Sequence, residues 1–173
     1  HLPLQSGSDP VLQRMGRPYS SSQYLDVAVA LAGRFPDAAM GADVIVGFPG
    51  ETDETARRTI EFIKNVESPQ AEGVLTWSLF PFILAPLSPI YEPAARKDYG
   101  LTGYMMNWKH DTMDSEQAAG YVLDAFLQLE NSDTIYSGDN IDLLFELGPK
   151  GRKEFIKCRH DLAKRGMSGQ LSE

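Results

Sequence analysis

Apolar residues follow two different spacings in the first half of the chain. Three short runs, at residues 1–4, 42–46 and 74–80, are mainly apolar, as expected of buried parallel strands. Between them, apolar residues recur every three or four positions over residues 21–34 and 53–65, which predicts two amphipathic helices. This alternation favours parallel βα units with right-handed crossovers. We therefore expect the three strands to lie parallel and adjacent in one sheet, with both helices on the same face.

Polar residues mark where the predicted helices begin. Ser20 followed by Gln23 is a capping box, and Thr52 is placed to cap the helix that follows it. Asp114 followed by Gln117 is a second capping box, and it opens a further predicted helix. The starts of these helices can thus be read from side chains able to bind the first free backbone N–H groups.

The regular pattern ends after residue 82. Four prolines fall within thirteen residues, and such a stretch is expected to be an extended loop: Pro81, Pro86, Pro89 and Pro93. Residues 141–147 are compatible with either a strand or a helix, and residues 149–164 predict a final amphipathic helix. The second half of the chain is therefore predicted to be a mainly α-helical extension.

Composition favours one globular domain, since 42% of the 173 residues are hydrophobic. The chain has no apolar run of transmembrane length and no signal-peptide pattern, so we expect a cytoplasmic protein without membrane contact. Cys158 is the only cysteine, and one thiol cannot hold a zinc ion or an iron–sulfur cluster. No metal site is therefore predicted within the chain. Its opening at His1, inside an apolar stretch, indicates a piece of a larger protein.

Charge is distributed unevenly. Residues 71–148 carry 3 basic and 12 acidic side chains, whereas residues 149–173 carry 7 basic and 3 acidic ones. Phosphate contacts supply most nucleic-acid affinity and need Lys and Arg, so the acidic middle argues against a nucleic-acid partner. We interpret the basic tail as the solvated face of a helix.

Two segments together resemble a known family. They are HLPLQSGSD at residues 1–9 and DVIVGFPGET at residues 43–52. In this order they resemble the second half of the radical S-adenosylmethionine (SAM) barrel, most closely that of the methylthiotransferases. The resemblance implies an α/β fold: a partial TIM-type (β/α) half-barrel with parallel strands over residues 1–82, followed by the mainly α-helical extension over residues 83–173.

The resemblance also implies the cofactors SAM and a [4Fe–4S] cluster, with the cluster ligands outside this chain. In the family a Gly-x-Ile-x-Gly pattern meets the adenine, and it falls here on Asp43, Ile45 and Gly47, with Asp43 in place of the first glycine. Polar residues at the end of the preceding strand meet the ribose or the methionine portion, and that place is taken by Gln5, Ser6 and Ser8. Sites in parallel α/β barrels do lie at the carboxyl ends of strands. The same residues could equally be only helix caps and turn formers. No catalytic residue is assigned.

The extension resembles a different branch. Residues 84–93, 99–101 and 108–113 are similar to the C-terminal stretch of cobalamin-binding-type radical SAM enzymes. We therefore expect a parent enzyme that cleaves SAM reductively and modifies an unactivated carbon by methyl transfer through cobalamin, with this chain inactive by itself. Methylthiotransferase-like sulfur insertion is the alternative within the enzyme class. A non-catalytic binding or assembly module is the alternative outside it.

An incomplete barrel is expected to need a partner. The missing N-terminal half of the parent protein would complete it, and exposed sheet edges also favour a homo-oligomer. The barrel-lining side chains left uncovered are predicted to be Leu2, Leu4, Val44, Val46, and Thr76 or Trp77. We interpret His110 as a polar residue of a loop that packs over the barrel mouth, rather than as an acid or base for the substrate. Trp108 and Tyr91 are interpreted as anchors of the proline-rich loop.

Overall fold

A parallel sheet forms the centre of the computed structural model, which describes residues 1–67, 74–134 and 146–167. Strand β1 (Ala39–Val46) pairs in parallel with β2 (Val74–Pro81) along its whole length. Strand β2 pairs in turn with the short strand β6 (Asp133–Thr134), also in parallel. The sheet order is therefore β1-β2-β6.

The N-terminal segment runs along the free edge of β1. The N–H groups of Leu2 and Gln5 donate to carbonyls of β1, and Gln5 forms a parallel bridge with Val44. This contact is one bridge rather than a regular strand, because Gln5 has a positive φ of 70° that turns the chain away. The expected parallel and adjacent arrangement of the three predicted strand segments is confirmed.

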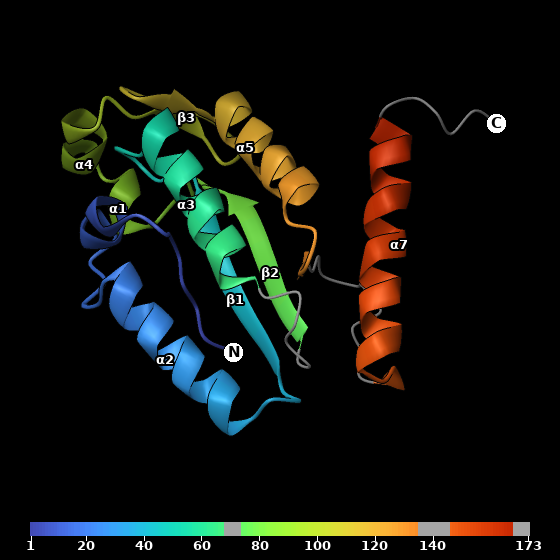
Figure 1. Cartoon of the computed structure of the whole chain (residues 1–173). Coiled ribbons are helices and arrows are strands. Elements are labelled where there is room, and N and C mark those ends of the chain that lie inside the picture. Colours follow the sequence, from blue (N-terminus) through green and yellow to red (C-terminus); the bar gives the residue numbers. More distant parts are fainter. Residues whose placement is uncertain (68–73, 135–145, 168–173) are drawn as a thin grey trace.

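Three helices cover one face of the sheet (Figure 1): α2 (Ser21–Arg34), α3 (Asp53–Val66) and α5 (Ser115–Gln128). Each begins at a predicted cap. Ser20, Thr52 and Asp114 each accept a hydrogen bond from the backbone N–H three residues later and complete a capping box. Helices α2 and α3 lie side by side through the rings of Tyr24 and Phe62, whose centroids are 6.3 Å apart. The predicted placement of both helices on one face is confirmed.

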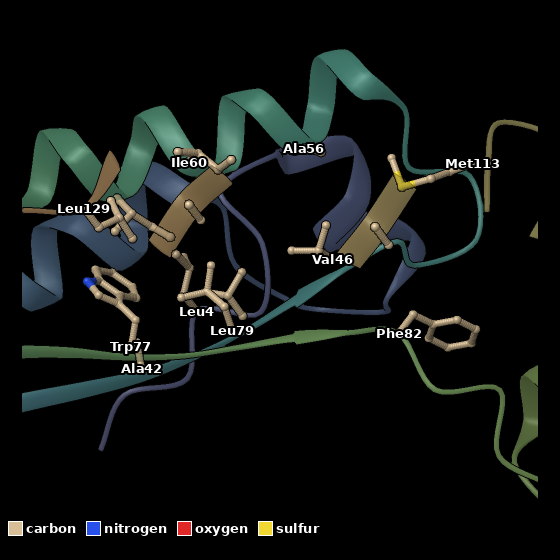
Figure 2. Packing of buried hydrophobic residues seen from close by; sticks show 14 of the residues in the cluster. Leu4, Ala42, Val46, Ala56, Ile60, Trp77, Leu79, Phe82, Met113 and Leu129 are labelled. Atoms are coloured by element: carbon tan, nitrogen blue, oxygen red, sulfur yellow. The ribbon is translucent and has the colours of Figure 1, made fainter. Parts of the chain in front are cut away.

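The core fills the space between the sheet and these helices (Figure 2). Val46 of β1 and Trp77 of β2 point into it together with Leu4 (Figure 2). Val44 belongs to the same cluster, and all four are at most 2% exposed. The expectation that Leu4, Val44 and Val46 line an open barrel face is therefore wrong. Of the two alternatives on β2, Trp77 faces the core and Thr76 faces the other side of the sheet. Side chains alternate between the faces of a strand, so their sequence neighbours occupy the opposite face, which α2, α3 and α5 leave uncovered and on which Thr76 is 4% exposed. Leu2 is partly buried against the same core.

Residues 82–114 form a compact excursion between β2 and α5. It contains a 3₁₀ turn η1 (Pro89–Tyr91), the short helix α4 (Pro93–Asp98) and an antiparallel sheet of three strands in the order β3-β4-β5. These strands are β3 (Thr102–Tyr104), β4 (Asn107–His110) and β5 (Met113–Asp114). The expectation of an extended loop is corrected here, because Pro89 and Pro93 open helical turns at positions where no N–H is needed. The extension also contains a sheet, so it is less uniformly helical than predicted.

Two further helices complete the described chain. Helix α1 (Asp9–Arg14) follows the N-terminal segment, and α7 (Pro149–Met167) packs beside the end of α5. Nε2 of His160 lies 3.1 Å from the carbonyl oxygen of Leu127, and Lys164 pairs with Glu130 at 2.5 Å. Of the ambiguous stretch 141–147, residues 141–145 lie outside the described residues. No helix in the described part of the chain is long and apolar enough to cross a membrane.

Candidate functional site

The uncovered face of the sheet carries the first group of candidate residues. Asp43 and Ile45 alternate with the buried residues of β1 and lie opposite Ser78 and Phe80 of β2. Oδ2 of Asp43 lies 3.1 Å from Nε2 of His1, and the Asp43 side chain is 40% exposed. Ile45 is half-buried and Phe80 is 42% exposed. A carboxylate and two apolar side chains thus share one accessible surface, which suits a flat ring that carries polar groups.

The second group lies at the end of the N-terminal segment and is held against α3. The Oγ of Ser6 is 3.1 Å from Oγ1 of Thr59 on α3 and accepts a hydrogen bond from the N–H of Ser8. A side chain at Gly7 would come within 2.7 Å of Phe62, so this turn packs directly on the helix. Ser6 and Ser8 are fully buried, and the Ser8 hydroxyl has no partner among the described residues. The structure therefore separates these serines from Asp43 and Ile45.

Gln5 lies between the two groups. Its side chain is 8% exposed, and its Oε1 accepts a hydrogen bond of 2.8 Å from Arg17. The amide is thus already engaged by the turn that follows α1. That Gln5, Ser6 and Ser8 contact a cofactor stays a prediction, as it does for Asp43, Ile45 and Gly47.

Gly47 opens the turn at the carboxyl end of β1 and needs to be glycine for two reasons. Its φ of 87° lies in the left-handed region. A Cβ at this position would also lie 2.5 Å from the ring of Trp108 and 2.7 Å from Cβ of Ala118. The glycine therefore lets the excursion and α5 approach the end of the strand.

A buried carboxyl group holds this turn. Oε2 of Glu51 accepts a hydrogen bond of 2.5 Å from the N–H of Gly47, and the residue is only 1% exposed. Burial raises the pKa of Glu51 to about 7, although hydrogen bonds from the N–H groups of Gly47 and Phe48 act in the opposite direction. Glu51 stands within the quoted GFPGET segment but was not predicted as a functional residue. The signal that could have found it is an acid in a turn made otherwise of small and apolar residues.

Two residues of the excursion complete the cluster. His110 is 1% exposed, and its Nε2 lies 3.3 Å from the carbonyl oxygen of Gly47. The N–H of Thr112 donates to Nδ1 of the same ring at 3.3 Å, and its hydroxyl donates to the backbone oxygen of Glu51 at 2.6 Å. Burial lowers the pKa of His110, against the hydrogen bond to Gly47 and the charges of Asp111 and Asp114. The expectation that His110 stands on a loop is wrong, because it is the last residue of strand β4, and its place over a barrel mouth stays a prediction.

The contacts of Trp108 fit its predicted role as an anchor, whereas that role stays a prediction for Tyr91. Nε1 of Trp108 donates to the carbonyl oxygen of Phe82 at 2.6 Å, and its ring stacks on His110 at 5.3 Å between centroids. Tyr91 packs under the guanidinium of Arg96, 4.8 Å from its ring centroid. Cys158 is exposed on α7. Within the described residues no three His, Cys, Asp or Glu side chains are grouped so as to hold a metal ion.

Comparison with known proteins finds relatives for about the first third of the chain. Residues 1–63 match the Radical SAM superfamily. A tRNA-2-methylthio-N(6)-dimethylallyladenosine synthase of Clostridium botulinum is 48% identical over 66 residues, which are 38% of this chain and 14% of that protein. The synthase of the same name from Lawsonia intracellularis is 49% identical over 67 residues, 39% of this chain and 15% of that protein.

The similarity to one relative extends somewhat further. The synthase of the same name from Thermosipho melanesiensis is 37% identical over 89 residues, which are 46% of this chain and 20% of that protein. The chain therefore spans between about one seventh and one fifth of the length of these relatives.

Proposed function

Because residues 1–63 are a radical SAM segment with methylthiotransferase-like motifs, we propose that the chain is part of a radical SAM enzyme and supplies the adenosine side of its cofactor site. The observation that carries the proposal is the uncovered face at the carboxyl end of β1. There Asp43 and Ile45 stand accessible, directly before the glycine turn. The parallel sheet with helices on one face is compatible with part of a βα barrel. We propose that it is half of one, and the division at residues 82 and 83 stays a prediction.

The residues present fit part of the cofactor and not all of it. Ile45 would contact the adenine ring, and Asp43 would accept hydrogen bonds from the sugar or the amine. SAM bound to a [4Fe–4S] cluster supplies a carbon-centred radical that abstracts hydrogen from an unactivated carbon. The cluster needs more thiolates than the single Cys158 provides. We propose that the cluster ligands come from an N-terminal half of the parent protein, which would be the main partner of this chain.

Sulfur insertion is the reaction that the comparisons favour. The relatives named above carry a methylthio product in their names, whereas cobalamin-dependent methyl transfer, expected from residues 84–113, gains no support from them. The relatives' names also specify tRNA as their substrate. The acidic composition of residues 71–148 favours a substrate other than nucleic acid for this chain. We therefore propose methylthiotransferase-like chemistry for the parent enzyme, with a substrate other than tRNA.

An assay of the parent protein tests this proposal. The protein is reconstituted with iron and sulfide without oxygen, reduced, and supplied with SAM, and 5′-deoxyadenosine is measured by chromatography. We expect 5′-deoxyadenosine and, when an acceptor substrate with an unactivated C–H bond is added, transfer of ³⁵S from the labelled sulfide to that carbon. Release of 5′-deoxyadenosine with transfer of a ¹⁴C-methyl group from labelled SAM, and no ³⁵S in the product, would instead support the hypothesis of cobalamin-dependent methyl transfer. Absence of SAM cleavage by a protein that holds its cluster would refute the proposed enzyme class.

A further inference from the structure

We propose that His110 and Thr112 are positioning residues for the turn that Gly47 opens. His110 holds the Gly47 carbonyl oxygen, and Thr112 holds the backbone of Glu51, whose carboxyl group binds the N–H groups of Gly47 and Phe48. His110 and Thr112 lie in the excursion between β2 and α5, more than sixty positions along the chain from the turn they contact. The structural part of this inference concerns only the chain's own hydrogen bonds. Its consequence for SAM binding rests on the proposed function.

Both flanking peptides of Gly47 are engaged. The N–H of Gly47 donates to the Glu51 carboxyl group, and the Gly47 carbonyl oxygen faces Nε2 of His110. The N–H of Phe48, on the far side of the same peptide as that carbonyl oxygen, is directed at Glu51 as well. A peptide unit is planar, so holding its oxygen on one side and its N–H on the other fixes its rotation. Gly47 has no Cβ to restrict its backbone dihedral angles, so these hydrogen bonds restrict its backbone conformation instead.

The direction of the bonds assigns the tautomer of His110. The N–H of Thr112 can only donate, so Nδ1 of His110 must accept. In a neutral ring the proton then lies on Nε2 and is donated to the Gly47 oxygen. Burial lowers the pKa of this imidazole and favours the neutral form. His110 therefore acts as a donor with a fixed orientation.

Thr112 closes the cluster at the other end of the turn. Its hydroxyl donates to the backbone oxygen of Glu51, the residue whose side chain holds Gly47. Gly47, Glu51, Thr112 and His110 thus form a closed ring of hydrogen bonds. The excursion sets the conformation of the turn next to the proposed adenosine surface.

Side-chain replacements distinguish hydrogen bonding from space filling. Glutamine can place its amide N–H₂ near the position of Nε2, whereas asparagine reaches only the position of Nδ1. We expect His110→Gln to leave amide hydrogen exchange at Gly47 and Phe48 within about threefold of the native rate, and His110→Asn to raise it by about tenfold or more. Thr112→Val, a milder change at an exposed position, should raise it between about threefold and tenfold. Thr102→Val is the matched control, since its hydroxyl bonds to Lys109 away from the turn.

Exchange is measured by NMR on the chain, with circular dichroism to show that each variant is folded. The inference would be overturned if His110→Gln and His110→Asn showed equal exchange rates at Gly47 and Phe48. It would also be overturned if the rates in Thr112→Val did not exceed those of the native chain. The same variants in the reconstituted parent test the consequence for the cofactor, where KM for SAM should rise for His110→Asn and not for His110→Gln. The expected exchange pattern with an unchanged KM would support the positioning of Gly47 and refute the adenosine surface of the proposed function.

Discussion

Glu51 should make the stability of this protein fall as the pH rises from about 4.5 to about 7. The folded chain keeps the Glu51 proton up to a pKa of about 7, whereas the unfolded chain loses it near 4.5. In that window the folded state binds more protons, so the free energy of unfolding decreases with pH by about 1.4 kcal/mol per unit. The stabilisation is complete below pH 4.5 and lost above about 7, a total of about 3 kcal/mol as an upper value. Because the side chain is 1% exposed, solvent screening reduces this little.

Glu51→Gln isolates this effect. Glutamine can still accept the hydrogen bond from Gly47 through its side-chain oxygen, but it cannot ionise. We expect the variant to match the native chain at pH 4.5 and to be more stable by up to about 3 kcal/mol at pH 8. Urea unfolding followed by tryptophan fluorescence at several pH values measures the difference. Taking the difference between the two chains removes the contribution of His110, whose lowered pKa acts in the opposite sense.

A matched surface variant serves as the control. Glu61→Gln on α3 removes a carboxylate that is 63% exposed and should leave the pH profile nearly unchanged. Parallel profiles for the native chain and Glu51→Gln would show that folding does not raise the pKa of Glu51, and the interpretation of the cluster would then be wrong.

Three further predictions follow from packing and composition. Gly47→Ala should destabilise the fold by about 2–4 kcal/mol in urea unfolding, because its Cβ would meet Trp108 and Ala118, and wild-type stability would contradict the packing. Trp108→Phe keeps an aromatic ring but loses the hydrogen bond to the Phe82 carbonyl oxygen, so we expect the free energy of unfolding in urea to fall by about 1–3 kcal/mol. An unchanged free energy of unfolding would refute the anchor role. The uncovered sheet face should make the chain associate, so light scattering over a concentration series should give a mass above 19.1 kDa, and a constant monomer mass would contradict this.

Local sequence signals predicted the central elements well. The capping residues Ser20, Thr52 and Asp114 set the starts of α2, α3 and α5, because those hydrogen bonds form within four residues of chain. The strand face was predicted wrongly for Val44 and Val46 and stayed open between Thr76 and Trp77, since apolar residues on both sides of a strand leave its orientation undetermined. The excursion was missed because strands of two to four residues give no readable alternation.

The candidate site could be predicted only in part, because some of its contacts join residues that are far apart in the sequence. Asp43 and Ile45 share one face of β1 and Gly47 directly follows the strand, so the quoted segment located them correctly on one short stretch of chain. The hydrogen bonds of His110 and Thr112 to that turn join residues about sixty positions apart, and spacing along the sequence carries no signal for them. The burial of Ser6 against Thr59 likewise depends on how the first turn packs on α3.

The most direct test of the adenosine surface is the affinity of the reconstituted parent protein for SAM when a charge is placed on that surface. Ile45→Asp puts a carboxylate where the adenine ring would lie, and Val29→Asp puts the same group on an exposed position of α2, 62% exposed, away from the sheet face. We predict that Ile45→Asp weakens SAM binding, measured by equilibrium dialysis, by about tenfold or more, while Val29→Asp leaves it within about twofold. Equal affinities for the two variants would contradict the assignment of this face to the cofactor.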